Sequence, residues 1–188
     1  PEFILLDTGR DGKYWRLAFD STTQYSLFRL KYPVEGTSIR LFKRLPAVAW
    51  PDFLQRSRDT IRYWCGHSET QVYFNGELLN LELAVDSPCS VEITAPGTRA
   101  VIGMTQDPLP EFGMYNHGLT LKQGREVIFP GLTFRIKSNY LEHTLTRDNV
   151  IFDKHYHKAM GILDRAAEHE LVDAFLGKVQ ALQKSLPQ

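Results

Sequence analysis

The sequence predicts a mixed α+β fold, because it contains two kinds of hydrophobic spacing. Short apolar runs separated by turn residues fill 1–44 and about 70–138, which is typical of antiparallel or mixed sheets. Apolar residues recur every three or four positions in 51–65 and again from about Thr146 onward, which is typical of amphipathic helices. The expected order is strands, a connecting helix, more strands and long C-terminal helices.

Residues 1–44 are predicted to form about four strands and no helix. The run FILLDTGRDGKYWRLAF bends between Gly9 and Gly12, and Pro33 marks a connector between two later strands. Such a sheet needs a layer over its apolar face. We expect that layer upstream of Pro1, in a larger parent protein.

A helix is predicted over 51–65, since Pro51 suits a first helical turn and Gly66 a helix end. Its apolar side recurs at helical spacing: Trp50, Phe53, Leu54, Ser57, Ile61 and Trp64. The strands that follow are predicted to turn at Asn75-Gly76, Gln123-Gly124 and Pro130-Gly131. From about Thr146 one apolar stripe predicts helix to the C-terminus, with a break near Ala166 to Glu170.

Composition narrows the class of function. The 188 residues carry 22 basic and 22 acidic side chains, and a formal net charge of zero disfavours binding to nucleic acid. No apolar run approaches the ~18 residues of a membrane helix, so we expect a cytoplasmic protein with no membrane partner. Cys65 and Cys89 lie far apart and are predicted to be reduced thiols.

Common catalytic and metal-binding motifs are not found. There is no Walker loop, no GxGxxG and no GxSxG. His155 and His157 are two residues apart and would point to different helix faces, so we predict no metal site. Lysines and arginines are spread along the chain and predict a solvated surface. Five aromatic residues could form a stacking platform, but their spacing favours core packing: Trp15, Trp50, Trp64, Tyr73 and Phe74.

Arg147, in the run YLEHTLTRDNV, is unusual for its position. If Thr146 caps a helix, Arg147 lies in the first turn, where the helix dipole disfavours a cation. One interpretation is a local ion pair with Asp148 or Glu142. The other is an anion site in which helix amides and the guanidinium hold a phosphate together. The residues alone leave both open.

The run YLEHTLTRDNV, followed by a long helix, resembles the catalytic loop of the middle domain in HtpG-type heat-shock chaperones of the GHKL ATPase superfamily. GTSIRLF resembles the strand that ends the ATPase domain of that family, and 51–65 resembles the helix that leads into the middle domain. The resemblance implies that Arg147 contacts the ATP γ-phosphate and that Thr37 lines the adenine pocket. It also implies a β-α-β sandwich of the transducer type.

The sequence departs from the family in several places. The Glu and Asn that handle water and magnesium, the Asp-x-Gly adenine site and the glycine-rich lid lie upstream in the family and are not in this chain. Ile151 replaces a glutamine four residues after the family arginine, which puts that second phosphate contact in doubt. The charged linker and dimerisation domain of the family are also missing.

The resemblance therefore leads us to expect a fragment of an ATP-dependent chaperone. Residues 1–44 would be the last strands of the nucleotide domain, and 45–188 the middle domain. The partners would be the upstream ATPase domain, which holds ATP and magnesium, and protein clients; a homodimeric parent is left open. The fragment alone should be inactive. The alternatives are a non-catalytic protein-interaction module and the transducer domain of a mismatch-repair or gyrase-type ATPase.

Overall fold

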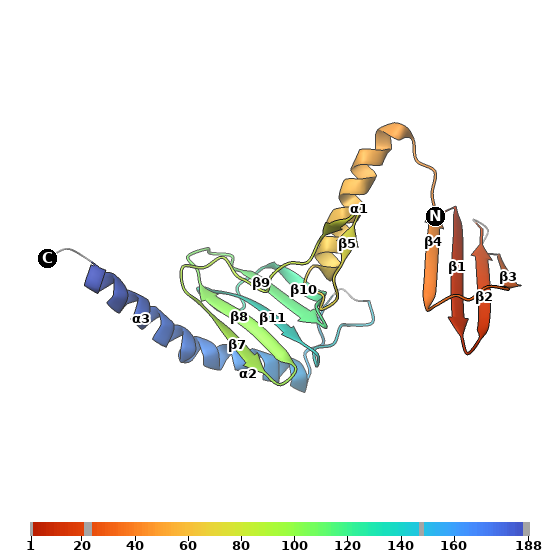
Figure 1. The fold of residues 1–188 in the computed structure, drawn as a ribbon. Coiled ribbons are helices and arrows are strands. Elements are labelled where there is room, and N and C mark those ends of the chain that lie inside the picture. The colour runs from red at the N-terminus through yellow and green to blue at the C-terminus, as the bar shows by residue number, and fades with distance from the viewer. Residues whose placement is uncertain (1, 21–23, 147–148, 186–188) are drawn as a thin grey trace. The chain divides into compact units, whose positions relative to one another are not determined.

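The structure, a computed structural model, describes residues 2–20, 24–146 and 149–185. The chain forms two compact units, Pro1–Gln55 and Arg56–Gln188, and the division falls inside the connecting helix α1 (Trp50–Cys65). Strands and helices occur in the expected order, so the predicted α+β class is confirmed (Figure 1). No helix within the described ranges combines the length and apolar character needed to cross a membrane.

The first unit is built on an antiparallel sheet of four strands, as predicted for 1–44. Its strands are β1 (Phe3–Arg10), β2 (Lys13–Phe19), β3 (Tyr25–Arg29) and β4 (Thr37–Phe42), in the order β3-β2-β1-β4. Asp11 and Gly12 make the β1–β2 turn with φ of 52° and 71°. A single 3-10 turn, η1 (Ala47–Ala49), leads into α1.

The register of this sheet gathers apolar side chains on one side. Leu6 of β1 lies opposite Leu17 and Ile39, and residues directly opposite each other project from the same side. We call this side the apolar face; its apolar members are Ile4, Leu6, Trp15, Leu17, Phe19, Tyr25, Leu27, Ile39 and Leu41. Several of these are well exposed, among them Ile39 at 59% and Leu41 at 65%. The apolar face therefore lacks a covering layer within the described residues.

The second unit contains a five-stranded sheet in the order β10-β9-β11-β8-β7. The strands are β7 (Ser90–Ala95), β8 (Thr98–Met104), β9 (Glu111–Asn116), β10 (Leu119–Arg125) and β11 (Leu132–Ser138). β11 runs parallel to β9 and antiparallel to β8, so the sheet is mixed. A small hairpin, β5 (Tyr73–Phe74) and β6 (Glu77–Leu78), turns at Asn75-Gly76 as predicted.

One predicted turn is wrong. Gln123-Gly124 lies within β10, and the β9–β10 hairpin turns instead at His117-Gly118, with φ of 46° and 78°. A Cβ atom on Gly118 would lie 1.9 Å from the carbonyl oxygen of His67, so glycine permits both the turn and this close approach. Pro130-Gly131 lies directly before β11, as predicted.

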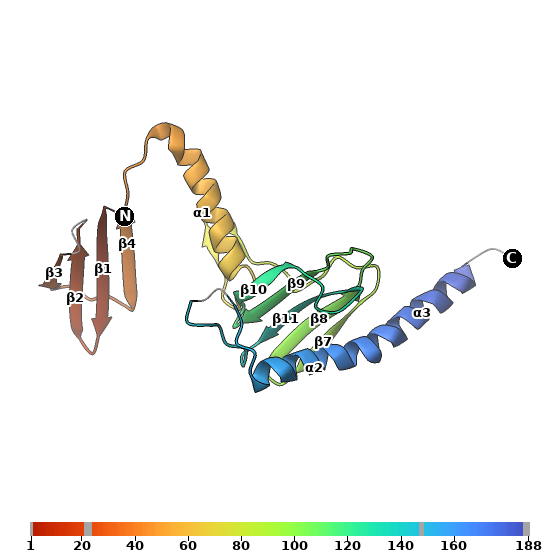
Figure 2. The same ribbon diagram turned by 180° about the vertical axis from the view of Figure 1, so that it is seen from behind.

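Helix α2 (Lys154–Glu168) and the start of α3 (Glu170–Ser185) lie along one side of this sheet, and the rest of α3 extends beyond its edge (Figures 1 and 2). The break near Ala166 to Glu170 is confirmed. The core contains the buried side chains between the two layers, such as Ala100, Ile102, Phe112, Met114, Phe134, Ile136, Ala159, Leu163, Ala166 and Leu171. Alternate residues of each strand supply this layer, and the others project from the opposite side.

The predicted helix start at Thr146 is wrong, because α2 begins at Lys154. Asp153 is the N-cap: its carboxylate accepts hydrogen bonds from the backbone N–H groups of His155 and Tyr156, each at 2.9 Å. The hydrogen bond from Tyr156 first, and then the one from His155, lower the pKa of Asp153. The segment before Asp153 instead forms an isolated antiparallel bridge between His143 and Val150.

The predicted burial of α1 and of its aromatic residues is also wrong in part. No α1 residue is buried, and Trp50 and Trp64 are 49% and 41% exposed. Tyr73 in the small hairpin is exposed as well, whereas Trp15 and Phe74 are half-buried. Helical spacing correctly predicted the amphipathic helix, but amphipathicity alone does not supply a partner for its apolar side.

Candidate functional site

Arg147 and Asp148 lie outside the described residues, so the choice between a local ion pair and a phosphate contact stays a prediction. The residues on either side are held together. Thr144 N–H donates to the Asn149 carbonyl at 2.9 Å, and Ile151 N–H donates to the Glu142 carbonyl at 2.8 Å. Leu141 and Val150 are almost completely buried. The described flanks of the YLEHTLTRDNV run are therefore anchored to the core of the second unit.

Thr37, the residue assigned to the adenine pocket by resemblance, begins β4 in the first unit. It lies opposite Thr8 of β1, and the two hydroxyl oxygens are 3.1 Å apart. Both threonines belong to the apolar face by register, and Thr37 is exposed. Thr37 thus offers a hydrogen-bonding group at the end of the apolar face, where the register also places Thr8 and Arg29.

The other side of that sheet carries a compact ionic cluster. Arg16 donates to both carboxylate oxygens of Asp7, at 2.6 and 2.7 Å, and Arg40 donates to one of them at 2.9 Å. Arg16 also donates to the Tyr32 hydroxyl at 2.9 Å. Mainly the Arg16 hydrogen bonds hold the pKa of Asp7 below its usual value. A carboxylate paired with two arginines is a poor general base, so the cluster is structural in character.

The second unit has a polar surface on the side of its sheet opposite α2 and α3, which we call the open face. Strand alternation places Glu92, Arg99, Arg135 and Lys137 there, since their strand neighbours Ile93, Ala100 and Ile136 belong to the core. Arg99 of β8 lies directly opposite Lys137 of β11. The sequence interpretation of the basic residues as scattered was wrong here, because strand pairing brings three of them together.

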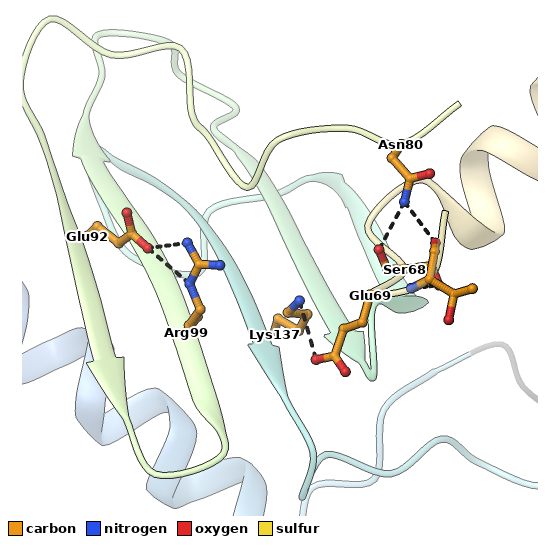
Figure 3. A network of polar contacts seen from close by, with 7 residues as sticks. Ser68, Glu69, Asn80, Glu92, Arg99 and Lys137 are labelled. Atoms are coloured by element: carbon orange, nitrogen blue, oxygen red, sulfur yellow. Dashed lines mark hydrogen bonds and ion pairs between the residues drawn. The ribbon is translucent and has the colours of Figure 1, made fainter. Parts of the chain in front are cut away.

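Three carboxylates of the described residues contact these cations. Glu111 of β9 lies 3.8 Å from Arg135 Nη2, and Figure 3 shows the other two. Glu92 of β7 accepts hydrogen bonds from Arg99, with Nε to Oε1 at 3.0 Å. Glu69, from the loop after α1, lies 3.5 Å from Lys137 Nζ. Asn80 holds that loop in place by donating to the carbonyl oxygens of Ser68 and Thr70, at 3.0 and 3.1 Å.

His67 is buried beside the same surface. Its Nε2 lies 3.1 Å from Arg135 Nη1, and its ring lies 4.3 Å from that of Tyr115. Burial first, and then the charge of Arg135, lower the pKa of His67 to about 4, although the Leu81 backbone opposes the shift. His67 is therefore neutral at pH 7, with Nε2 accepting from Arg135. Its Nδ1 has no hydrogen bond of normal geometry within the described residues.

Two hollows on the open face share Arg99 and Lys137 in their walls. One, of about 430 Å³, also contacts His67, Ser68, Glu82 and Glu92. The other, of about 510 Å³, is also bordered by Glu69, Thr94 and Asn139. Among the described residues no group of three or more His, Cys, Asp or Glu side chains could hold a metal ion. The arrangement is suited to binding a polar ligand.

Comparison with protein-family models finds none that matches this chain, and a search of curated proteins finds no match either.

The period-two alternation in FRIKS and TRAVIG was the available sequence signal for the open face. This alternation predicts that charged and core residues project from different sides of each strand, but it does not predict which strands pair.

Proposed function

We propose that this chain is part of an HtpG-like, ATP-dependent chaperone, with 1–44 completing a nucleotide domain and 45–188 acting as its middle domain. The observation that carries the proposal is the apolar face of the first unit, with the Thr8 and Thr37 hydroxyls at one end. An ATPase domain of this family would cover such a face with its own upstream layer. The adenine base would then lie near Thr37.

The exposed apolar face is energetically significant. Tyr25, Leu27, Ile39 and Leu41 each keep more than half of their surface in water. Burying one such side chain completely contributes about 1.5–3 kcal/mol, so covering the remaining surface of all four would add roughly 4–7 kcal/mol. A small sheet gains stability when its apolar face is covered, which supports the assignment of this sheet to a larger domain.

Arg147 is the residue proposed to couple the nucleotide to the middle domain. A guanidinium is always charged and can donate two parallel hydrogen bonds to a phosphate, and arginines supplied from another domain stabilise the charge that develops during phosphoryl transfer. ATP supplies the phosphoryl group, and magnesium and water are handled by residues upstream of this chain. Contact with the γ-phosphate only in the closed state would couple ATP binding to domain closure and to bound clients.

The test is ATP turnover by the full-length parent carrying Arg147→Ala. We expect turnover to fall at least about tenfold while nucleotide affinity is nearly unchanged, because the contact forms mainly in the transition state. Arg165→Ala, an exposed position in the last turn of α2, is the matched control and should keep full turnover. Unchanged turnover in Arg147→Ala would support the local ion pair instead.

Calorimetry on the 188-residue chain separates the proposal from a nucleotide-binding domain complete in itself. We expect no ATP binding at micromolar concentrations, since only Thr37 and Arg147 are assigned to the nucleotide. If the full-length parent neither binds nor hydrolyses ATP, the non-catalytic interaction module is the better interpretation.

A further inference from the structure

Two cationic side chains are direct cross-strand neighbours on the open face. Arg99 and Lys137 are directly opposite in the antiparallel β8–β11 pair, where Cβ atoms are about 4.5–5.5 Å apart and like charges are destabilising. Arg135 lies two residues before Lys137 and projects from the same side. Arg135 is paired with Glu111 of β9, whose Oε2 lies 3.8 Å from Arg135 Nη2, so the like charges that face each other directly are those of Arg99 and Lys137.

The carboxylates near these cations lie on opposite sides of the pair. In Figure 3 Glu92 approaches Arg99 from β7, whereas Glu69 approaches Lys137 from the loop after α1. The Glu92 and Glu69 side chains are 51% and 57% exposed, so both ion pairs are screened by solvent. The Lys137 side chain is only 16% exposed, and Lys137 borders both hollows. The charge pattern across the surface is negative, positive, negative.

The size and charge of the two hollows narrow the class of ligand. Hollows of about 430 and 510 Å³ that share Arg99 and Lys137 extend well beyond a single inorganic oxyanion. Glu82 and Glu69 on their walls would repel a polyanion such as nucleic acid. Thr94 and Asn139 offer hydrogen-bonding side chains to a peptide backbone.

We infer that the open face binds an extended polypeptide segment in which an acidic residue is flanked at two-residue spacing by basic residues. The acidic side chain binds between Arg99 and Lys137, and the basic side chains lie against Glu92 and Glu69. Side chains two apart on an extended chain project to the same side about 6.5 Å apart, which suits this alternation of charge. The inference does not depend on ATP binding or on Arg147.

The test is fluorescence anisotropy of labelled peptides with the 188-residue chain at low salt. A peptide centred on Lys-Ser-Glu-Ser-Lys should bind at least about fivefold more tightly than one centred on Glu-Ser-Lys-Ser-Glu, because the second places like charges together. Equal affinity for the two peptides would overturn the inference. Full displacement of the first peptide by inorganic phosphate at the same concentration would also overturn it, in favour of a simple anion site.

Variants distinguish lost binding from lost folding. Lys137→Gln should weaken binding of the first peptide at least about fivefold, and Lys137→Glu should reverse the order of the two peptides, a gain that misfolding cannot mimic. Lys184→Glu, in the last turn of α3, makes the same charge change away from the open face and should leave the order unchanged. If Lys137→Glu and Lys184→Glu behave alike, net charge rather than the open face determines binding, and the inference fails.

Discussion

Gly118 joins the β9–β10 turn to the segment that carries His67, and its replacement by alanine tests that contact. The φ of Gly118 is +78°, and an added Cβ would lie 1.9 Å from the His67 carbonyl oxygen and 2.4 Å from its carbonyl carbon. These are backbone atoms, so the contact cannot be relieved by rotating a side chain. Either the turn or the His67 segment must shift.

The expected destabilisation of the second unit has two parts. A non-glycine residue in the left-handed region costs about 1 kcal/mol. Forcing extra volume into a packed site costs about 1–3 kcal/mol more, which brings the total for Gly118→Ala to about 3 kcal/mol. Gly76→Ala is the matched control for the first part, because Gly76 also has a positive φ, +83°, but nothing lies within 4 Å of its added Cβ.

A third alanine substitution should change stability in the opposite direction. Gly161 lies within α2, and its added Cβ meets nothing within 4 Å. Gly161→Ala should therefore stabilise the unit by roughly 0.5–1 kcal/mol, because glycine loses more backbone entropy in a helix. The three variants share one chemical change and differ only in backbone conformation and surroundings.

Native-state hydrogen exchange is the suitable assay, because the chain has two units and a single unfolding curve would mix them. The backbone amides of Ile102 and Ile136, in the buried centre of the second sheet, report the opening free energy of that unit. A Gly118→Ala effect within about 0.5 kcal/mol of that of Gly76→Ala, the usual error of such comparisons, would refute the close approach to His67.

Two further predictions concern buried side chains of the second unit. The folded pKa of His67 is about 4 against 6.5 for an ordinary histidine, so its contribution to stability is complete above pH 6.5 and is lost as the pH falls from 6.5 to 4. The loss should reach at most about 3 kcal/mol and be absent in His67→Phe. A His67 imidazole NMR signal that titrates near pH 6.5 would contradict this prediction. Leu163→Ala, at a position 0% exposed, should destabilise the unit by about 3 kcal/mol, whereas Leu182→Ala, at 65% exposed, should cost under about 0.5 kcal/mol. Equal effects on hydrogen exchange of the Ile102 and Ile136 amides would show that α2 does not pack as described.

Local sequence signals predicted the secondary structure well where the relevant interactions are short in range. Asn75-Gly76 predicted its hairpin, and Pro51 and Gly66 lie next to the two ends of α1. The start of α2 was missed because Thr146 and Asp153 are both good N-cap residue types, and Val150, which lies before Asp153, pairs instead with His143.

The sequence by itself determined which residues share a face of each element, because side chains alternate on a strand and recur every 3.6 residues on a helix. The apolar character of one side of the first sheet follows from that rule. Only the tertiary structure decided that β11 lies between β9 and β8, which sets Lys137 opposite Arg99. Strand pairing is determined by long-range contacts that bury Ala100, Ile102, Phe134 and Ile136 together. The charged residues that alternate with them on β8 and β11 lie side by side as a consequence.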